Sequence, residues 1–243
     1  MNNYKGRNPT SSIREAKGIW TLNDQYKNRS ENTWPIKKSV LTYITGGTST
    51  TQAASYTNNI NVGGTPVYLI GVYAYRTTST SLSSPTINSV AATKINSAYR
   101  AGSAYFELAI CISSAKVSGS SVPFVVSGPV MQRFLYACYS LSTDEPNIID
   151  SFKNPPDGAT QGISVTLTSG VADGIGIAAA LGMTNNTITG VSIGSGPVTS
   201  NYNSGVIATA NALIVGTVTG SGNIVFNASG SSQLIMGCLA QWR

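Results

Sequence analysis

The stretch that decides the fold of this chain is Val67-Tyr-Leu-Ile-Gly-Val-Tyr-Ala-Tyr75. Most of its residues are β-branched or aromatic, the side chains that suit a pleated sheet, and the run is almost continuously apolar. That combination predicts a central strand. From Ser39 onward the chain shows strands and turns with almost no helical periodicity, so we expect an all-β protein.

Other segments show strand patterns of two kinds. The clearest alternation is Ile163-Ser-Val-Thr-Leu-Thr168, and residues 105–112 and 134–139 alternate as well. Because side chains two apart share one face of a strand, the segment 163–168 should bury one side and expose the other. The apolar segment 234–242 predicts a core strand that ends the chain, and the small residues of 174–182 predict a tightly packed strand.

Turn signals separate these runs at intervals of about 10–20 residues, the spacing of an antiparallel sandwich or barrel. Helices between parallel strands have no room in this pattern. We therefore predict an antiparallel, jelly-roll-like β-sandwich, with the proline-containing stretch Ser142–Gln161 as a surface loop. The turn signals are Gly46-Gly47, Gly63-Gly64, Ser83-Ser84-Pro85, Ala101-Gly102, Gly128-Pro129, Asn185-Asn186, Gly194–Pro197, Gly220–Gly222 and Gly230.

Residues 1–38 differ in composition from everything after them. Eight Lys and Arg residues and three Asp and Glu residues give this segment +5 of the formal net charge of +6. Acids and the aromatic rings of Trp20, Tyr26 and Trp34 are interspersed among the bases, which suits docking on a protein surface better than binding nucleic acid. We predict a mostly extended basic attachment arm (1–38) with short helical turns, followed by a β-sandwich domain (39–243).

The chain contains no histidine, the residue most used for proton transfer near neutral pH and the commonest metal ligand. No serine or cysteine has a partner that would activate it as a nucleophile. Glycan hydrolysis needs only two carboxylates, so the acids of the domain are the remaining candidates. Glu107 lies in a strand, where an edge position or a salt bridge is the alternative to catalysis. We predict no enzyme activity, no metal and no cofactor, after weighing Glu107, Asp144, Glu145, Asp150, Asp157 and Asp173.

Three cysteines, Cys111, Cys138 and Cys238, each lie inside an apolar run. Free cysteine behaves as a small hydrophobic residue, so we expect three core thiols.

No stretch approaches the roughly 20 apolar residues of a membrane helix. The first residues also lack the apolar segment of a signal peptide, so we expect synthesis in a bacterial cytoplasm without membrane insertion.

The segment Ile13–Pro35 resembles a motif in structural proteins of tailed bacteriophages, notably marine and cyanobacterial ones. The shared pattern is a glycine and a hydrophobic residue before Trp-x-Leu, then polar residues with an aromatic, then Trp-Pro. The resemblance implies an attachment segment, a β-sandwich behind it, a place in the virion and a homo-oligomer, in which threefold arrangements are common. Residues 67–76, 86–95 and 105–112 are similar to the strands of that sandwich. The residues predicted to form the docking interface are Ile19, Trp20, Leu22, Tyr26, Trp34 and Pro35.

These observations predict a virion structural protein whose arm docks on other virion proteins and on copies of itself. A carbohydrate-binding adhesin that recognises a host surface glycan is the alternative, and a depolymerase is the third hypothesis. Tyr56, Tyr99, Tyr105 and Tyr202 lie near turns or strand ends, where aromatic rings stack on sugars, although packing within the sheets is the interpretation we favour. Tail fibre, baseplate appendage and capsid decoration all remain open.

Overall fold

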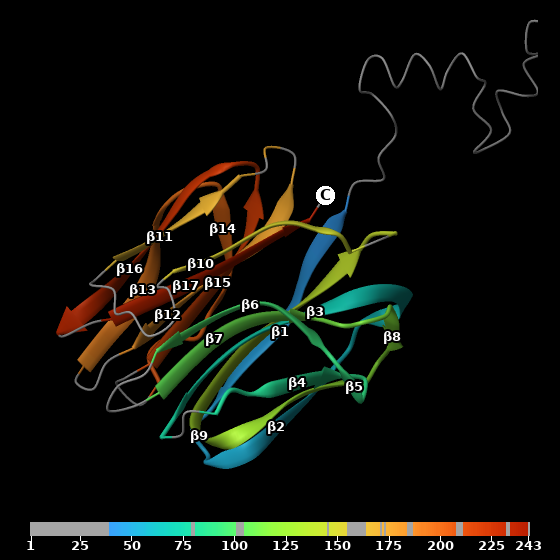
Figure 1. Cartoon of the computed structure of the whole chain (residues 1–243), viewed down its shortest axis with the longest axis horizontal. Helices are drawn as coiled ribbons and strands as arrows, with labels where there is room; N and C mark the ends of the chain where they lie inside the picture. Colours follow the sequence, from blue (N-terminus) through green and yellow to red (C-terminus); the bar gives the residue numbers. More distant parts are fainter. Residues whose placement is uncertain are drawn as a thin grey trace, which may run out of the picture. The chain divides into compact units, whose positions relative to one another are not determined.

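The computed structural model describes residues 39–78, 81–100, 105–144, 146–154, 164–170, 172, 174–183, 187–207, 211–231 and 234–242. The arm, its helical turns and the docking residues from Ile19 to Pro35 lie outside these residues and stay predictions. Within the described residues every regular element is a β-strand and every strand pair is antiparallel, so the predicted all-β class is confirmed (Figure 1). None of these residues forms a helix that could cross a membrane.

The strands that the structure describes form three sheets. The first has the order β5-β4-β9-β3-β7-β6, with β1 and β2 also paired to β9 and β8 paired to β3. Its strands are β1 (Val40–Ser49), β2 (Ala53–Ile60), β3 (Gly63–Thr77), β4 (Ser84–Ile87), β5 (Val90–Ala91), β6 (Thr93–Arg100), β7 (Tyr105–Ile112), β8 (Val117–Gly119) and β9 (Val122–Ser142). The second has the order β10-β17-β12-β15-β14, with β10 (Ile148–Asn154), β12 (Ile175–Met183), β14 (Val198–Asn203), β15 (Asn211–Thr219) and β17 (Leu234–Trp242). The third is β11 (Ser164–Ser169), β16 (Gly222–Ser231) and β13 (Thr187–Ser195).

The second sheet is buried on both faces. Ile177 and Leu181 of β12 pack in a core shared with β3, β7 and β9 of the first sheet, which we call the inner core. Ala178 and Ala180, which point the other way, pack in a second core shared with β11, β13 and β16 of the third sheet. A strand with two buried faces needs apolar side chains at every position, which explains the continuous apolar runs of β12, β15 and β17. The predictions of a core strand at 234–242 and of a packed strand at 174–182 are confirmed.

The first sheet also has two apolar faces. Ile70 and Val72 of β3 belong to the inner core, whereas Leu69 and Tyr73 belong to a third core on the opposite face. The predicted central position of the segment 67–75 is therefore confirmed, because β3 pairs with both β7 and β9. In the third sheet only one face is buried: Val165 and Leu167 are buried while Ser164, Thr166 and Thr168 are exposed, as their alternation predicts.

Several of the predicted turns fall within strands; Gly230 lies in β16 and Gly63-Gly64 begin β3. Gly128-Pro129 falls within β9, at a point where the ladders to β2 and β3 have no paired residues between Ser127 and Met131. A proline, which has no N–H to donate, is tolerated at such an interruption. Gly46 and Gly47 lie within β1. Glycine is needed at these strand positions because aromatic rings fill the space that a side chain would occupy. A Cβ atom on Gly46 would lie 2.5 Å from the Tyr202 ring.

The predicted surface loop Ser142–Gln161 contains a strand, β10, so that prediction is wrong over residues 148–154. β10 pairs with β17 and forms one edge of the second sheet. Its Ile148, Ile149 and Phe152 are partly exposed, as expected of an edge strand with one neighbour. The prolines that suggested a loop precede the strand at Pro146 and follow it at Pro155, so they bound β10 without interrupting its ladder.

Candidate functional site: a cleft between β6 and β10 with a buried carboxylate behind it

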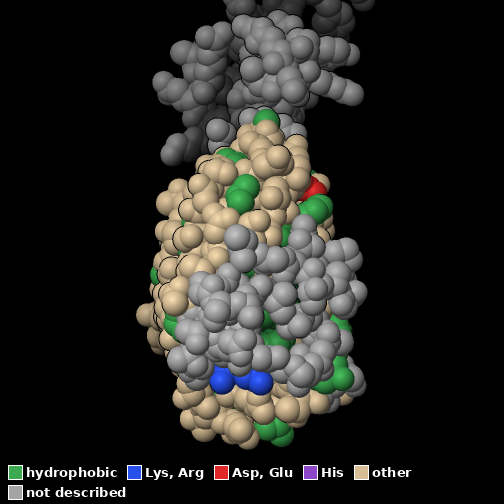
Figure 2. Space-filling model, turned by 90° about the vertical axis from the view of Figure 1, so that its left-hand side faces the viewer, with side chains coloured by type: hydrophobic (Ala, Val, Ile, Leu, Met, Phe, Trp, Pro, Cys, Tyr) green, Lys and Arg blue, Asp and Glu red, His purple; other side chains and the backbone are tan. Residues whose placement is uncertain are grey.

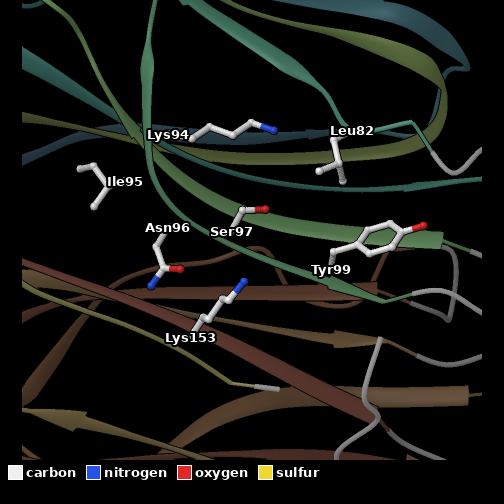
Figure 3. Close-up of a pocket in the computed structure, with 7 residues that line it drawn as sticks. All are labelled: Leu82, Lys94, Ile95, Asn96, Ser97, Tyr99 and Lys153. Atoms are coloured by element: carbon white, nitrogen blue, oxygen red, sulfur yellow. The ribbon is translucent and has the colours of Figure 1, made fainter. Parts of the chain in front are cut away.

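A cleft of about 360 Å³ lies where β6 of the first sheet faces β10 of the second. Figure 3 shows Lys94 and Lys153 on opposite sides of Ser97, with the Tyr99 ring at one end. Aliphatic, amide, hydroxyl, aromatic and ammonium groups all reach this one surface. The lining residues are Leu82, Lys94, Ile95, Asn96, Ser97, Tyr99 and Lys153.

An irregularity in β6 arranges this lining. The register of β6 against β7 shifts between Lys94 and Asn96. In a regular strand residues three apart point to opposite faces, but one extra residue resets the alternation. Lys94 and Ser97 consequently reach the same carboxylate of Glu107, while Asn96 turns toward the second sheet and donates from Nδ2 to the Leu239 carbonyl at 3.3 Å.

Glu107 is completely buried, and both of its carboxylate oxygens are fully engaged. Oε1 accepts from Lys94 Nζ at 2.6 Å and from Ser97 Oγ at 3.1 Å. Oε2 accepts from the Tyr75 hydroxyl at 2.5 Å, from Ser83 N at 3.1 Å and from Ser83 Oγ at 2.8 Å. A buried carboxylate is tolerated only when it is paired and hydrogen-bonded in this way. Of the two alternatives to catalysis left open by the sequence, a salt bridge is the one observed.

The phenols around Glu107 stay protonated over a wide pH range. Burial, reinforced by the charge of Glu107, raises the pKa of Tyr75 and of Tyr73 well above the usual value. The Tyr73 hydroxyl lies 2.9 Å from Ser83 Oγ, so the chain of hydroxyl groups extends one residue beyond the carboxylate. Protonated phenols are hydrogen-bond donors, and the network therefore fixes Glu107 as an acceptor.

Three of the carboxylates weighed for glycan hydrolysis, Glu107, Asp144 and Asp150, lie among the described residues. Glu107 is used by its five donors, and Asp150 Oδ2 accepts from Gly170 N at 2.9 Å. Among those residues no group of three or more His, Cys, Asp or Glu side chains could hold a metal ion. Glu145, Asp157 and Asp173 lie outside the described residues.

The three cysteines are free and buried, which confirms the predicted core thiols. Burial raises the pKa of the Cys111 thiol to about 12 and that of Cys138 well above its usual value. A thiol is nucleophilic only as the thiolate, so burial keeps Cys111 and Cys138 in the unreactive thiol form at neutral pH.

The four singled-out tyrosines divide into two groups. Tyr56 stacks on Phe134 with ring centroids 4.5 Å apart, and Tyr202 packs against Tyr43 in the inner core, so for these two the packing interpretation is confirmed. Tyr99 and Tyr105 stack on each other with centroids 6.1 Å apart, and Tyr99 also lines the cleft.

Sequence reasoning placed the site on the arm and found only Tyr99 among the residues that line the cleft. A signal was nevertheless present, because charged residues make up only 10% of the chain and each lysine inside a strand is unusual. Figure 2 shows a face on which uncharged groups dominate and charged side chains are few. Comparisons with protein-family models, with curated proteins and with solved structures find no match for this chain, so its function has to be inferred from its own residues.

Proposed function

We propose that this chain is a non-enzymatic structural subunit of a bacteriophage particle, either a tail-fibre or baseplate appendage or a capsid-decorating subunit. The observation that carries the proposal is the resemblance of Ile13–Pro35 to the attachment segment of such proteins. In this proposal the arm docks on other virion proteins through Ile19, Trp20, Leu22, Tyr26, Trp34 and Pro35. The sandwich behind the arm is wound as a jelly roll and packs against copies of itself as a homo-oligomer, for which we propose a trimer.

The build of the domain supports this proposal. Eight of the 17 described strands, β3 and β9 among them, pair with two or more neighbours. The buried carboxylate is engaged in hydrogen bonds that join β3, β6 and β7. A fully satisfied buried network makes the sheet rigid, and it leaves the Glu107 carboxylate with no free oxygen for acid–base chemistry. The first strand, β1, begins at Val40 and is paired with β9 from that residue on, so a load on the arm would pass directly into the first sheet.

The test is assembly of phage particles that carry Trp20→Ala or Trp34→Ala in this chain. Truncating an aromatic anchor in an interface typically costs about 2 kcal/mol or more, and the loss repeats over symmetric copies. We expect folded subunits with an unchanged melting temperature that fail to join particles, and a cryo-EM map of the wild-type particle that contains this chain. Wild-type occupancy in both variants, or unfolding of both, would contradict the proposed role of the arm.

The β6–β10 cleft favours a second candidate function, binding of a host surface glycan. A sugar ring presents C–H groups to an aromatic face and hydroxyl groups to amides and hydroxyls, which Tyr99, Asn96 and Ser97 supply. Lys153 brings a positive charge to one side of Ser97 (Figure 3), so we propose that the saccharide is acidic. The charge of Lys94, on the other side of Ser97, is balanced by Glu107.

An array of acidic and neutral glycans tests the second function. Tyr99→Ala and Lys153→Ala should abolish binding to acidic glycans, while Lys116→Ala, which removes a lysine that lies over the Tyr68 ring, should leave binding intact. Equal binding by all three variants, or no binding by the wild type, would remove this candidate.

A further inference from the structure

Two arginines face each other at the edge of the inner core. Arg76 of β3 and Arg133 of β9 are directly opposed in the antiparallel ladder. Directly opposed residues have Cβ atoms about 4.5–5.5 Å apart, and like charges in such a pair repel. Ala74 and Leu135, two residues away on each strand, belong to the inner core, so both arginines leave the first sheet on the side of the second sheet.

Nothing in the described part of the chain balances these two charges. Neither guanidinium has a described carboxylate within the 4.0 Å of an ion pair, and Lys94–Glu107 lies elsewhere in the sheet. Arg76 instead lies over the Phe106 ring, 5.9 Å from its centroid, and Arg133 Nη1 donates to Asn211 Oδ1 at 3.1 Å. Partial burial and the charge of Arg76 both lower the pKa of Arg133, as expected for a cation with no counter-charge.

Asn211 contributes a donor that has no acceptor. This residue begins β15 in the second sheet, and its side chain is completely buried. Because Oδ1 accepts from Arg133, the amide cannot be flipped, and Nδ2 is left as a buried donor without a partner. Arg76 Nε is a second buried donor without a partner. Arg133 connects the two residues, because it opposes Arg76 in the ladder and donates to Asn211. Buried donors are almost always satisfied in folded proteins, so two of them on the neighbours of one arginine mark a place where an acceptor belongs.

We propose that Arg76, Arg133 and Asn211 form a binding site for an oxyanion, a carboxylate, sulfate or phosphate group, between the first and second sheets. Every unsatisfied polar group at this place is a donor or a cation. The complementary ligand group must therefore offer oxygen acceptors and negative charge. The planar guanidinium fork matches these groups in geometry as well as in charge. None of the three residues lines the β6–β10 cleft. The proposal of an oxyanion site is therefore independent of whether the chain binds a glycan or joins a virion.

The first test is a titration of the ¹⁵N-labelled full-length chain with sodium sulfate at constant ionic strength, followed by NMR. The Asn211 side-chain amide and the Arg76 Nε–H should shift with a saturating curve. Losing one charge-assisted contact should weaken binding about tenfold or more in Arg133→Gln and in Arg76→Gln. Lys116→Gln is the matched control, because it removes an equal charge elsewhere, and it should titrate like the wild type.

Parallel titrations with phosphate and with acetate identify the source of the anion. Saturation by acetate at lower concentration than by sulfate indicates the carboxylate of a polypeptide or uronic acid, and the reverse order indicates a free or esterified tetrahedral anion. Shifts that stay linear in all three salts, or that persist unchanged in both arginine variants, would overturn the proposal.

A second variant tests the same site without an added ligand. Asn211→Asp places a carboxylate against Arg133, the arginine that opposes Arg76, so it should raise the melting temperature in the absence of sulfate and abolish the sulfate-induced shifts. Asn227→Asp, a change at an exposed position in β16, should do neither. A lower melting temperature for Asn211→Asp would show that the arginines do not lack a counter-charge, which contradicts the proposal.

Discussion

Tyr75 and Glu107 are directly opposed in the β3–β7 ladder, and the Tyr75 hydroxyl donates a 2.5 Å hydrogen bond to Glu107 Oε2. The other oxygen of the same carboxylate reaches Lys94, whose side chain is 24% exposed and lines the β6–β10 cleft. Glu107 thus links the buried face of the first sheet to the surface. The stability of the sheet and the shape of the cleft depend on the same side chain.

Glu107→Gln should lower the free energy of unfolding by about 2–4 kcal/mol, because it removes the charge that pairs with Lys94 and replaces one acceptor oxygen with an NH2 group that faces the surrounding donors. Urea unfolding measures this change. Asp150→Asn is the matched control, since it makes the same chemical change at a carboxylate with one backbone hydrogen bond, and it should cost about 1 kcal/mol or less. Equal losses in the two variants would mean that the Glu107 network contributes no more than a single surface hydrogen bond.

The domain should lose stability in alkaline solution from about pH 9 upward. Burial raises the pKa of Cys111 from 9.0 to about 12 and raises those of Tyr73 and Tyr75 above 10.0. Between the unfolded and folded pKa values these groups are ionised only in the unfolded chain, which binds fewer protons there, so the free energy of unfolding falls as pH rises. The slope is up to about 1.4 kcal/mol per pH unit for each such group. Urea midpoints measured from pH 7 to pH 11 check this, and a constant midpoint would contradict it.

Gly176→Ala should destabilise the second sheet by about 1–3 kcal/mol, the usual cost of overpacking. A Cβ atom at this position would lie 2.6 Å from the Ala240 carbonyl oxygen, in the closely packed ladder between β12 and β17. Gly64→Ala is the control, because no atom lies within 4 Å of its Cβ position, and it should change stability by less than about 0.5 kcal/mol. Thermal unfolding of both variants gives the comparison. Equal stability of the two variants would show that the β12–β17 ladder accommodates the extra methyl group without loss of stability.

Removal of residues 1–36 should leave a folded domain that unfolds cooperatively, because the first strand among the described residues begins at Val40. The truncated chain should keep the circular dichroism of a β protein and lose the ability to join particles. Aggregation, or loss of the sheet signal, would show that the arm belongs to the core and that the boundary at residue 38 is misplaced.

The sequence by itself determined the all-β class, the central strand at 67–75, the core strands at 174–182 and 234–242 and the burial of the cysteines. These are consequences of local pattern. Alternation of apolar and polar residues marks one buried face, an unbroken apolar run marks two, and both patterns are written in neighbouring positions of the chain. Tyr99 was found as well, because an aromatic ring at a strand end is visible without knowledge of its neighbours.

Only the tertiary structure decided which faces meet. The stacking of three sheets, the strand β10 inside a proline-bounded stretch and the passage of β9 through Gly128-Pro129 depend on pairing partners far away in the chain. The surroundings of Glu107 and of the Arg76–Arg133 pair also depend on residues that are distant in the chain. Glu107 is an acceptor because Tyr75, Ser83 and Lys94 arrive from three other segments. The charge of Arg76 is unbalanced because its opposite on β9 is Arg133, a pairing set by strand register, and no local pattern encodes which residue lies across a ladder.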